Sequence, residues 1–151
     1  MIVPFVDLVA QYESIKGGID RAISEVLGTA AFIGGKWVAE FGDAFARELG
    51  AKHCVPVGNG TDAIYIVLRM LGVGPGDEVI VPASSWISTS EVVSQTGAMP
   101  VFVDVDACMH IDAARIEAAV TGRTKAIIPV HLYGQAADMD PILQVASNRG
   151  L

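Results

Sequence analysis

The chain has 151 residues, of which 52% are hydrophobic and 18% charged, and its formal net charge is -7. This length and apolar content suit one globular domain with a buried core, whereas the acidic balance, with ten scattered lysines and arginines, argues against nucleic-acid binding. The apolar runs are shorter than the roughly 20 residues that span a bilayer, and no basic signal-peptide segment begins the chain. We therefore expect a cytoplasmic protein that does not bind a membrane.

The cysteines and histidines do not indicate a metal centre. Cys54 and Cys108 lack a C-x-x-C spacing and border apolar strands, so we expect buried, reduced thiols. His53, His110 and His131 are far apart, and none forms an i, i+4 pair on a predicted helix. The sequence therefore predicts no metal site.

The first fifty residues have the pattern of an arm, two helices and a connecting loop. Met1–Gln11 is predicted to be an extended arm, and amphipathic helices are predicted over Tyr12–Leu27 and Trp37–Leu49. The connecting loop has an apolar tip, Phe32–Gly34, beside a second glycine. Such a tip either anchors a turn in the core or serves an interface or a binding site, and the pattern leaves both open.

From residue 51 the chain alternates between strand and helix patterns. The predicted strands are His53–Val57, Glu78–Pro82, Pro100–Val105 and Lys125–Val130. The predicted helices are Thr61–Leu71, Ser88–Thr96, Asp112–Val120 and Asp138–Arg149. The strands are nearly continuous apolar runs, which indicates an α/β fold with a mostly parallel sheet buried on both faces. In such sheets ligands bind at the carboxyl ends of the strands.

A glycine-rich turn joins the first predicted strand to its helix. Gly58 and Gly60 allow positive φ and close backbone approach, whereas Thr61 and Asp62 are residue types that cap a helix. Free N–H groups and the positive end of the helix dipole then favour a bound phosphate or carboxylate. We predict that this turn holds the phosphate of a cofactor.

The same turn fits the dinucleotide pattern G-x-G-x-x-A, so a nicotinamide-dependent oxidoreductase is one alternative. In that pattern an acidic residue at the far end of the next strand binds the ribose, whereas Glu78 begins its strand. After this strand, Trp86 lies in a polar loop, where it could stack on a planar cofactor or pack against a helix start. His131 follows the fourth strand, and a lone histidine is most often structural.

Five segments match a known family in order and spacing: Val3–Leu8, Phe32–Gly35, Gly58–Ala63, Gly74–Pro82 and Ile128–Gln135. Together they resemble the DegT/DnrJ/StrS family of nucleotide-sugar aminotransferases. The resemblance implies the fold-type I architecture of pyridoxal-phosphate (PLP) enzymes and a homodimer with active sites between the subunits. It also implies transfer of an amino group from glutamate to a keto sugar linked to a nucleotide.

The resemblance also assigns roles to individual residues. The positions that bind the cofactor phosphate are matched by Gly60, Thr61 and Asp62. The aromatic residue that stacks on the pyridine ring is matched by Trp86. The segments near the substrate and the dimer contact are matched by Phe32, Ile33, Gly34 and, less directly, His131.

The family also uses an aspartate at the pyridine nitrogen and a lysine that binds the cofactor covalently, and in the family both come after the position of Leu151. We therefore expect the N-terminal portion of a large domain, with a helical arm and a dimer or substrate loop in residues 1–50 and alternating strands and helices in 51–151. The chain should contain no catalytic residue and be inactive alone. A non-catalytic regulatory or interaction protein on this scaffold is the second alternative.

Overall fold

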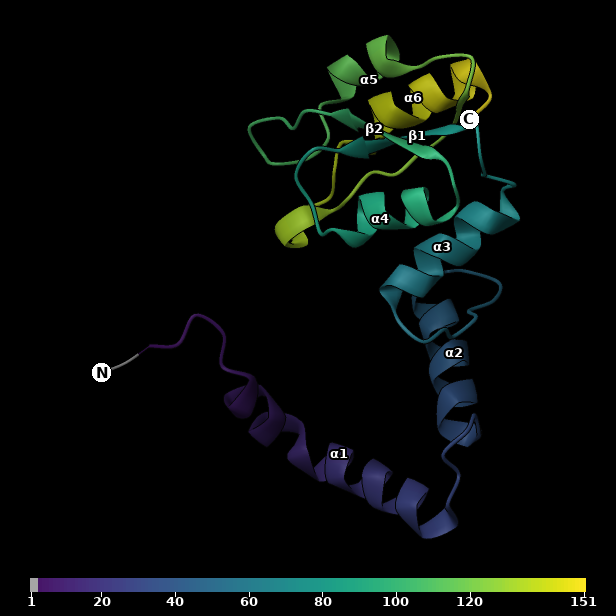
Figure 1. The fold of residues 1–151 in the computed structure, drawn as a ribbon. Coiled ribbons are helices and arrows are strands. Elements are labelled where there is room, and N and C mark those ends of the chain that lie inside the picture. The colour runs from purple at the N-terminus through teal and green to yellow at the C-terminus, as the bar shows by residue number, and fades with distance from the viewer. Residues whose placement is uncertain (1–2) are drawn as a thin grey trace. The chain divides into compact units, whose positions relative to one another are not determined.

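A computed structural model describes residues 3–151, which divide into two compact units, Met1–Pro56 and Val57–Leu151. We call them the N-terminal unit and the C-terminal unit and describe each by itself. The N-terminal unit contains two helices, α1 (Leu8–Thr29) and α2 (Lys36–Glu48). The C-terminal unit contains three strands, four α-helices and a short 3-10 turn at Leu132–Gly134 (Figure 1).

Helix α1 begins earlier than predicted, because Asp7 caps it. The carboxylate of Asp7 accepts a hydrogen bond from the backbone N–H of Ala10 at 2.9 Å, which stabilises a first turn starting at Leu8. The predicted extended arm is therefore wrong for residues 8–11, and its first two residues lie outside the described residues. The helix also continues past Gly28 and ends where Ala30 adopts a left-handed φ of 52°.

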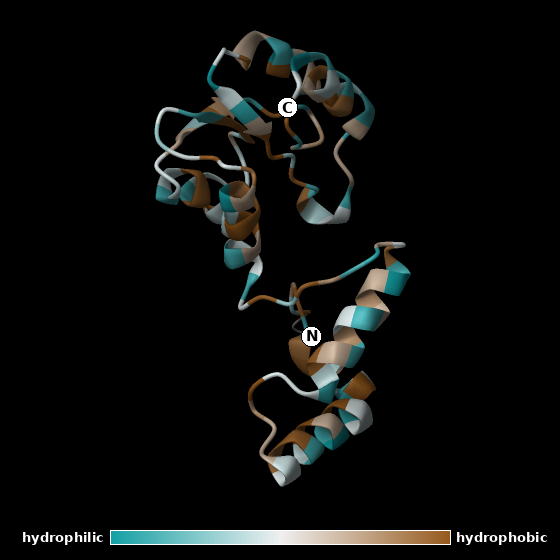
Figure 2. Ribbon diagram, turned by 90° about the vertical axis from the view of Figure 1, so that its right-hand side faces the viewer, coloured by the Kyte–Doolittle hydropathy of each residue, from teal (hydrophilic) through white to brown (hydrophobic). Residues whose placement is uncertain are grey.

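The apolar faces of both helices in the N-terminal unit are largely exposed. Helix α1 has no buried residue, and α2 buries only Gly42 and Ala46. Hydrophobic residues nevertheless recur along both helices, as Figure 2 shows by colour. The tip of the connecting loop is the extreme case, since the side chain of Ile33 is 97% exposed.

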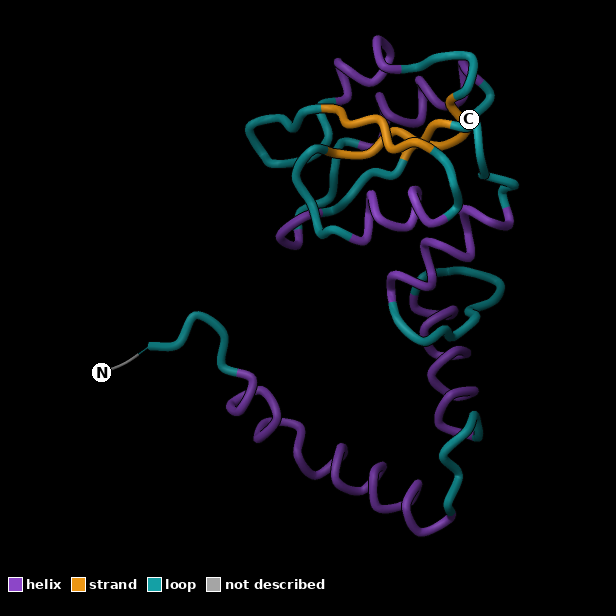
Figure 3. The backbone as a smooth tube through the Cα atoms, viewed as in Figure 1, coloured by secondary structure: helices purple, strands orange, loops and turns teal. Residues whose placement is uncertain are grey.

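The C-terminal unit is built on a three-stranded parallel sheet (Figure 3). Its strands are β1 (Glu78–Pro82), β2 (Met99–Val103) and β3 (Thr124–Ile127), in the order β2-β1-β3. Every residue of β1 is buried, whereas β2 and β3 are partly exposed. The predicted burial on both faces is therefore confirmed for the central strand and wrong for the two edge strands, which have a neighbour on one side only.

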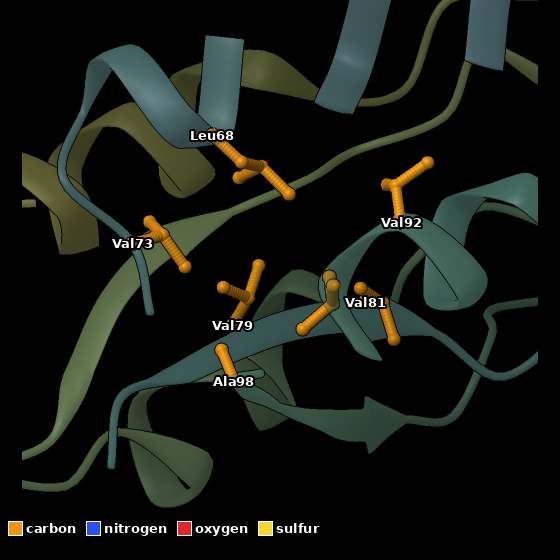
Figure 4. Close-up of a cluster of buried hydrophobic side chains, with 7 residues drawn as sticks. Leu68, Val73, Val79, Val81, Val92 and Ala98 are labelled. Carbon is orange, nitrogen blue, oxygen red and sulfur yellow. The ribbon is translucent and has the colours of Figure 1, made fainter. Parts of the chain in front are cut away.

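Alternate residues of β1 enter two separate cores on the two faces of the sheet. Val79 and Val81 pack with Leu68, Val92 and Val93 from α3 (Gly60–Met70) and α4 (Ser88–Gln95), as Figure 4 shows for this cluster. On the opposite face Ile80 packs with residues of α5 (Ala113–Ala119) and α6 (Met139–Arg149). This alternation follows from the two-residue period of a strand, and it gives the three-layer α/β arrangement.

The predicted strand His53–Val57 is not a strand in the structure. Its backbone pairs with no strand of residues 3–151, and the side chain of Val55 is 80% exposed. Pro56 has no N–H to donate to a neighbouring strand. The apolar run therefore has the sequence pattern of a strand but no neighbouring strand to pair with. The cysteines differ from expectation as well: Cys54 is half-buried and Cys108 is exposed.

The amino end of β1 carries an ion pair in which the carboxylate of Glu78 is buried and the side chain of Arg123 is exposed. The carboxylate of Glu78 accepts hydrogen bonds from the hydroxyl of Thr121 and from the guanidinium of Arg123, whose Nε lies 3.0 Å from Oε1. These bonds, that of Thr121 first, lower the pKa of Glu78 below its ordinary value of 4.5. The pair ties the central strand to the segment that leads into β3.

Candidate active site

Asn59 caps helix α3 and thereby shapes the predicted anion turn. Its backbone is extended, and its Oδ1 accepts a hydrogen bond from the N–H of Asp62 at 2.9 Å. Its Nδ2 donates to Oδ2 of Asp62 at 3.0 Å, so the two side chains hold each other. The prediction that Thr61 and Asp62 cap the helix is therefore wrong, because both already lie inside its first turn.

The two glycines of the turn act through space rather than through positive φ. Neither Gly58 nor Gly60 is among the glycines with positive φ, which corrects the expectation. A Cβ at position 58 would lie 2.9 Å from Oδ2 of Asp62, whereas one at position 60 would meet nothing within 4 Å. Gly58 therefore makes room for the capping pair, and the approach to Gly60 is open.

Two N–H groups at the start of α3 remain available for a ligand. The N–H of Ala63 donates to the carbonyl of Asn59 at 3.1 Å, and the N–H of Asp62 is bonded to the cap. Within residues 3–151, the N–H groups of Gly60 and Thr61 have no hydrogen-bond acceptor. Free donors at the positive end of a helix dipole form a site for an anion such as phosphate.

A cavity of about 530 Å³ lies at this turn. It brings together three segments of the C-terminal unit: the start of α3, the loop and helix start after β1, and the segment after β3. Its walls are formed by Gly60, Thr61, Ile64, Trp86, Ser88, Thr89, Ile128, Pro129, Val130 and His131. The cavity thus lies at the carboxyl edge of the sheet, where ligands of parallel α/β folds bind.

Three of the four predicted cofactor-binding residues line this cavity: Gly60, Thr61 and Trp86. The indole of Trp86 is 76% exposed, so its faces are available to a planar ring. Asp62 is not in the wall, and its carboxylate is engaged by Asn59. Its position in the turn supports the cap of the helix rather than direct contact with a ligand.

His131 lines the cavity, and a hydrogen bond to one ring nitrogen indicates which nitrogen carries the hydrogen in the neutral form. Its Nδ1 accepts a hydrogen bond from the backbone N–H of Ala137 at 3.0 Å. The neutral ring therefore carries its hydrogen on Nε2, which can donate to a ligand. The following Tyr133 has a left-handed φ of 57°, which is unusual for a residue with a side chain.

The remaining predicted site residues belong to the N-terminal unit. Phe32 and Ile33 are exposed, and Gly34 has a φ of 66°. Their assignment to a substrate or dimer contact stays a prediction.

Two polar wall residues were not predicted from the sequence, Thr89 and Ser88, and the second makes a contact across the site. Its hydroxyl lies 2.8 Å from that of Thr61, although the two residues are 27 positions apart. The available signal was a serine at the start of a helix that follows a buried strand, and this signal is too common to single it out.

Neither a cluster of metal-ligand side chains nor a membrane-spanning helix occurs in residues 3–151. No group of three or more histidine, cysteine, aspartate or glutamate side chains in that range could hold a metal ion. None of the helices there combines the length and the apolar character needed to cross a membrane.

The sequence model of the DegT/DnrJ/EryC1/StrS aminotransferase family matches residues 13–151. A "Pleiotropic regulatory protein" of Geobacillus stearothermophilus is 49% identical over 152 residues, which are 100% of this chain and 41% of that protein. A UDP-2-acetamido-2-deoxy-3-oxo-D-glucuronate aminotransferase of Pseudomonas aeruginosa is 48% identical over 99% of this chain and 42% of its own length. The chain thus spans about two fifths of the curated relatives it matches.

The crystal structure of ntda from Bacillus subtilis with the bound cofactor PMP superposes with a TM-score of 0.93 at 38% identity, over 99% of this chain and 35% of that one. The fold-type I prediction is confirmed over the matched part. PMP is the amino form of PLP, so the predicted cofactor is also confirmed at the level of the family. The nicotinamide alternative finds no support in these comparisons.

Proposed function

Because the chain belongs to the DegT/DnrJ/EryC1/StrS aminotransferase family, we propose that it forms the phosphate-binding and ring-binding part of a PLP-dependent sugar aminotransferase. The full protein would move an amino group from glutamate to a keto sugar linked to a nucleotide, in amino-sugar biosynthesis. We further propose that it works in the cytoplasm.

The observation that carries this proposal is the 530 Å³ cavity at the carboxyl edge of the sheet. Its floor offers the free N–H groups of Gly60 and Thr61 to a phosphate, and the positive end of the α3 dipole favours the charge. The exposed ring of Trp86 would stack on the cofactor ring, and Nε2–H of His131 would donate to a polar group of the ligand.

When bound, PLP supplies an electron sink for the carbon that loses or gains a proton during amino transfer. The residues of this chain bind and orient that cofactor. In the described part of the chain no lysine lines the cavity, and Lys125 of β3, the one lysine in residues 57–151, is exposed. We therefore propose that residues 1–151 alone bind cofactor weakly and do not transaminate.

A homodimer is part of the same proposal. Exposure to water is unfavourable for large apolar side chains. Such side chains are exposed at the tip, Phe32–Gly34, and in the arm at Val3, Phe5 and Val6. A second copy of the chain would cover such side chains, and the resemblance to dimeric enzymes assigns the tip and the arm to this contact.

The second candidate function is regulatory. The relative with 49% identity is named a pleiotropic regulatory protein, so the same scaffold occurs under a regulatory description. On this alternative the protein would bind a ligand or partner without chemistry.

The deciding experiment is the intact mass of the native protein together with its absorption spectrum, before and after borohydride reduction. An aminotransferase should show a mass well above 15.8 kDa, a visible PLP band, and cofactor fixed to the protein by reduction. It should also aminate a nucleotide-linked keto sugar with glutamate. Protein of greater mass that binds PLP without turnover would favour the regulatory alternative, and protein without PLP would refute the proposal.

A further inference from the structure

Ser88 differs from the other serines of helix α4 in what its hydroxyl contacts. The hydroxyls of Ser90 and Ser94 donate to carbonyls of their own helix, those of Ile87 and Ser90, at 3.2 and 3.4 Å. The hydroxyl of Ser88 instead lies 2.8 Å from Oγ1 of Thr61, on a different helix. Ser88 is only 7% exposed, and both Ser88 and Thr61 line the cavity.

The hydroxyl hydrogens of Thr61 and Ser88 determine which of the two residues can donate to a ligand. Each hydroxyl has one hydrogen, and in the unliganded pair either oxygen can be the donor. A phosphate dianion only accepts hydrogen bonds, so a hydroxyl that contacts it must spend its hydrogen there. If Thr61 donates to phosphate, its oxygen is left as an acceptor, and Ser88 is the donor beside it.

We propose that Ser88 is a positioning residue, which donates to Oγ1 of Thr61 and so directs the Thr61 hydrogen toward a bound phosphate monoester. This inference rests on the proposed function, because it takes the phosphate of the cofactor as the ligand. Such a chain of hydrogen bonds strengthens each link, and the charge of the phosphate fixes its direction. Ser88 itself does not touch the ligand.

Removing the Ser88 hydroxyl frees Thr61 to turn its hydrogen elsewhere. A threonine in the first turn can donate to a carbonyl of the preceding residues, which competes with phosphate. One lost hydrogen bond of this kind corresponds to about a 3- to 10-fold weaker affinity for a ligand that carries the phosphate. Pyridoxal, which has the ring but no phosphate, should be affected by less than 2-fold on the same estimate.

The test measures dissociation constants of PLP and of pyridoxal for the native protein and its variants. Ser88→Ala and Thr61→Val should each weaken PLP binding. The double variant should bind PLP no more weakly than the single variant with the lower affinity, because the two hydroxyls act as one chain. Ser94→Ala is the matched control, since it removes a hydroxyl of the same helix that bonds only to a backbone carbonyl. Ser88→Thr, which keeps the hydroxyl, should bind PLP with the affinity of the wild type.

The phosphorus-31 chemical shift of bound PLP gives an independent readout, and it should move in Ser88→Ala but not in Ser94→Ala. Equal weakening of PLP and pyridoxal, additive single effects, or an unmoved phosphorus signal would overturn the inference. If Ser88→Ala does not fold, Ser88→Cys, with a weaker donor of similar size, takes its place.

A wild-type protein that binds no PLP would refute the proposed function, and inorganic phosphate then serves as the probe. Phosphate binding that depends on Ser88 would support the role of Ser88 even though the aminotransferase function is refuted. Phosphate binding that ignores Ser88, or no phosphate binding, would overturn the inference as well.

Discussion

The two units of this chain share an apolar composition but differ in where their apolar side chains lie. Residues 57–151 bury them in two cores on the faces of one sheet. Among the described residues 3–56, Ala46 is the one buried hydrophobic residue. The C-terminal unit therefore supplies its own stabilising interior, whereas the N-terminal unit consists of helices whose apolar faces need a surface from outside the unit.

Helix α2 is an example of this difference. Phe41 and Phe45 stack on each other with ring centroids 5.5 Å apart, yet both remain exposed. An amphipathic pattern thus predicts a helix and the face that will be covered, but it does not say by what. The exposed apolar face of α2 is the structural basis for the proposed dimer.

Removal of a core side chain from the central strand should have the largest effect on stability. Ile80→Ala deletes a fully buried side chain of the central strand, and it should lower the free energy of unfolding by about 2–5 kcal/mol. Ile15→Ala on exposed α1 should change it by less than about 1 kcal/mol. Urea unfolding of each variant, followed by circular dichroism, gives the two changes in free energy. Equal losses would mean that the N-terminal unit has an interior of its own.

A second variant separates stability from binding within the C-terminal unit. Trp86→Ala should weaken PLP affinity by about 1–3 kcal/mol through lost stacking and burial. Because the indole is mostly exposed, unfolding of the unliganded protein should change by no more than about 0.5 kcal/mol. The measurement is a PLP titration beside a melting curve. Unchanged PLP affinity would remove Trp86 from the site.

The ion pair between Glu78 and Arg123 at β1 predicts a pH dependence confined to the C-terminal unit. The pKa of Glu78 is lower in the folded state than its ordinary 4.5, since Thr121 and Arg123 bond to its charged form. Its stabilisation is therefore fully present above pH 4.5 and is lost as the pH falls through the folded-state value.

Urea unfolding followed by circular dichroism at several pH values checks this prediction, with Glu78→Gln as the comparison. Stability of the wild type should fall more steeply below pH 4.5 than that of the variant. Identical slopes would show that Glu78 titrates alike in the folded and unfolded chains.

Replacing a glycine by alanine should have smaller effects on stability, of opposite sign in the two units. Gly17→Ala lies inside α1 with nothing within 4 Å of the new Cβ, so it should stabilise the helix by up to about 1 kcal/mol. Gly97→Ala should destabilise the C-terminal unit, because φ is +87° and the new Cβ would lie 2.9 Å from Cγ of Pro75. Circular dichroism for the first and urea unfolding for the second give the readouts. A loss of helix in Gly17→Ala would reveal a neighbour at that face.

Much of the C-terminal unit could be predicted from the sequence. The strand Glu78–Pro82 has the predicted bounds, and three predicted site residues, Gly60, Thr61 and Trp86, line one cavity at the carboxyl edge of the sheet. These features follow from local patterns: an apolar run, a turn and a helical period. His53–Val57 has the same local pattern, but a strand also requires a partner, which the pattern does not contain.

The details of the site depended on backbone geometry and on distant contacts. Asn59, Thr61 and Asp62 are all good capping residues, and only the extended backbone at position 59 decides among them. The pairing of Thr61 with Ser88 joins residues 27 apart, so no sequence window shows it.

The order β2-β1-β3 also determines how the C-terminal unit folds. Glu78 pairs with Met99 and Ile80 pairs with Ile127, so each pairing must close a loop of some 20 residues or more, and no local hairpin can nucleate the sheet. During synthesis the central strand is made first and keeps one free edge until β3 emerges. The most deeply buried strand of the unit is thus the one that waits longest for its neighbours, and in that interval the nascent chain needs protection from aggregation.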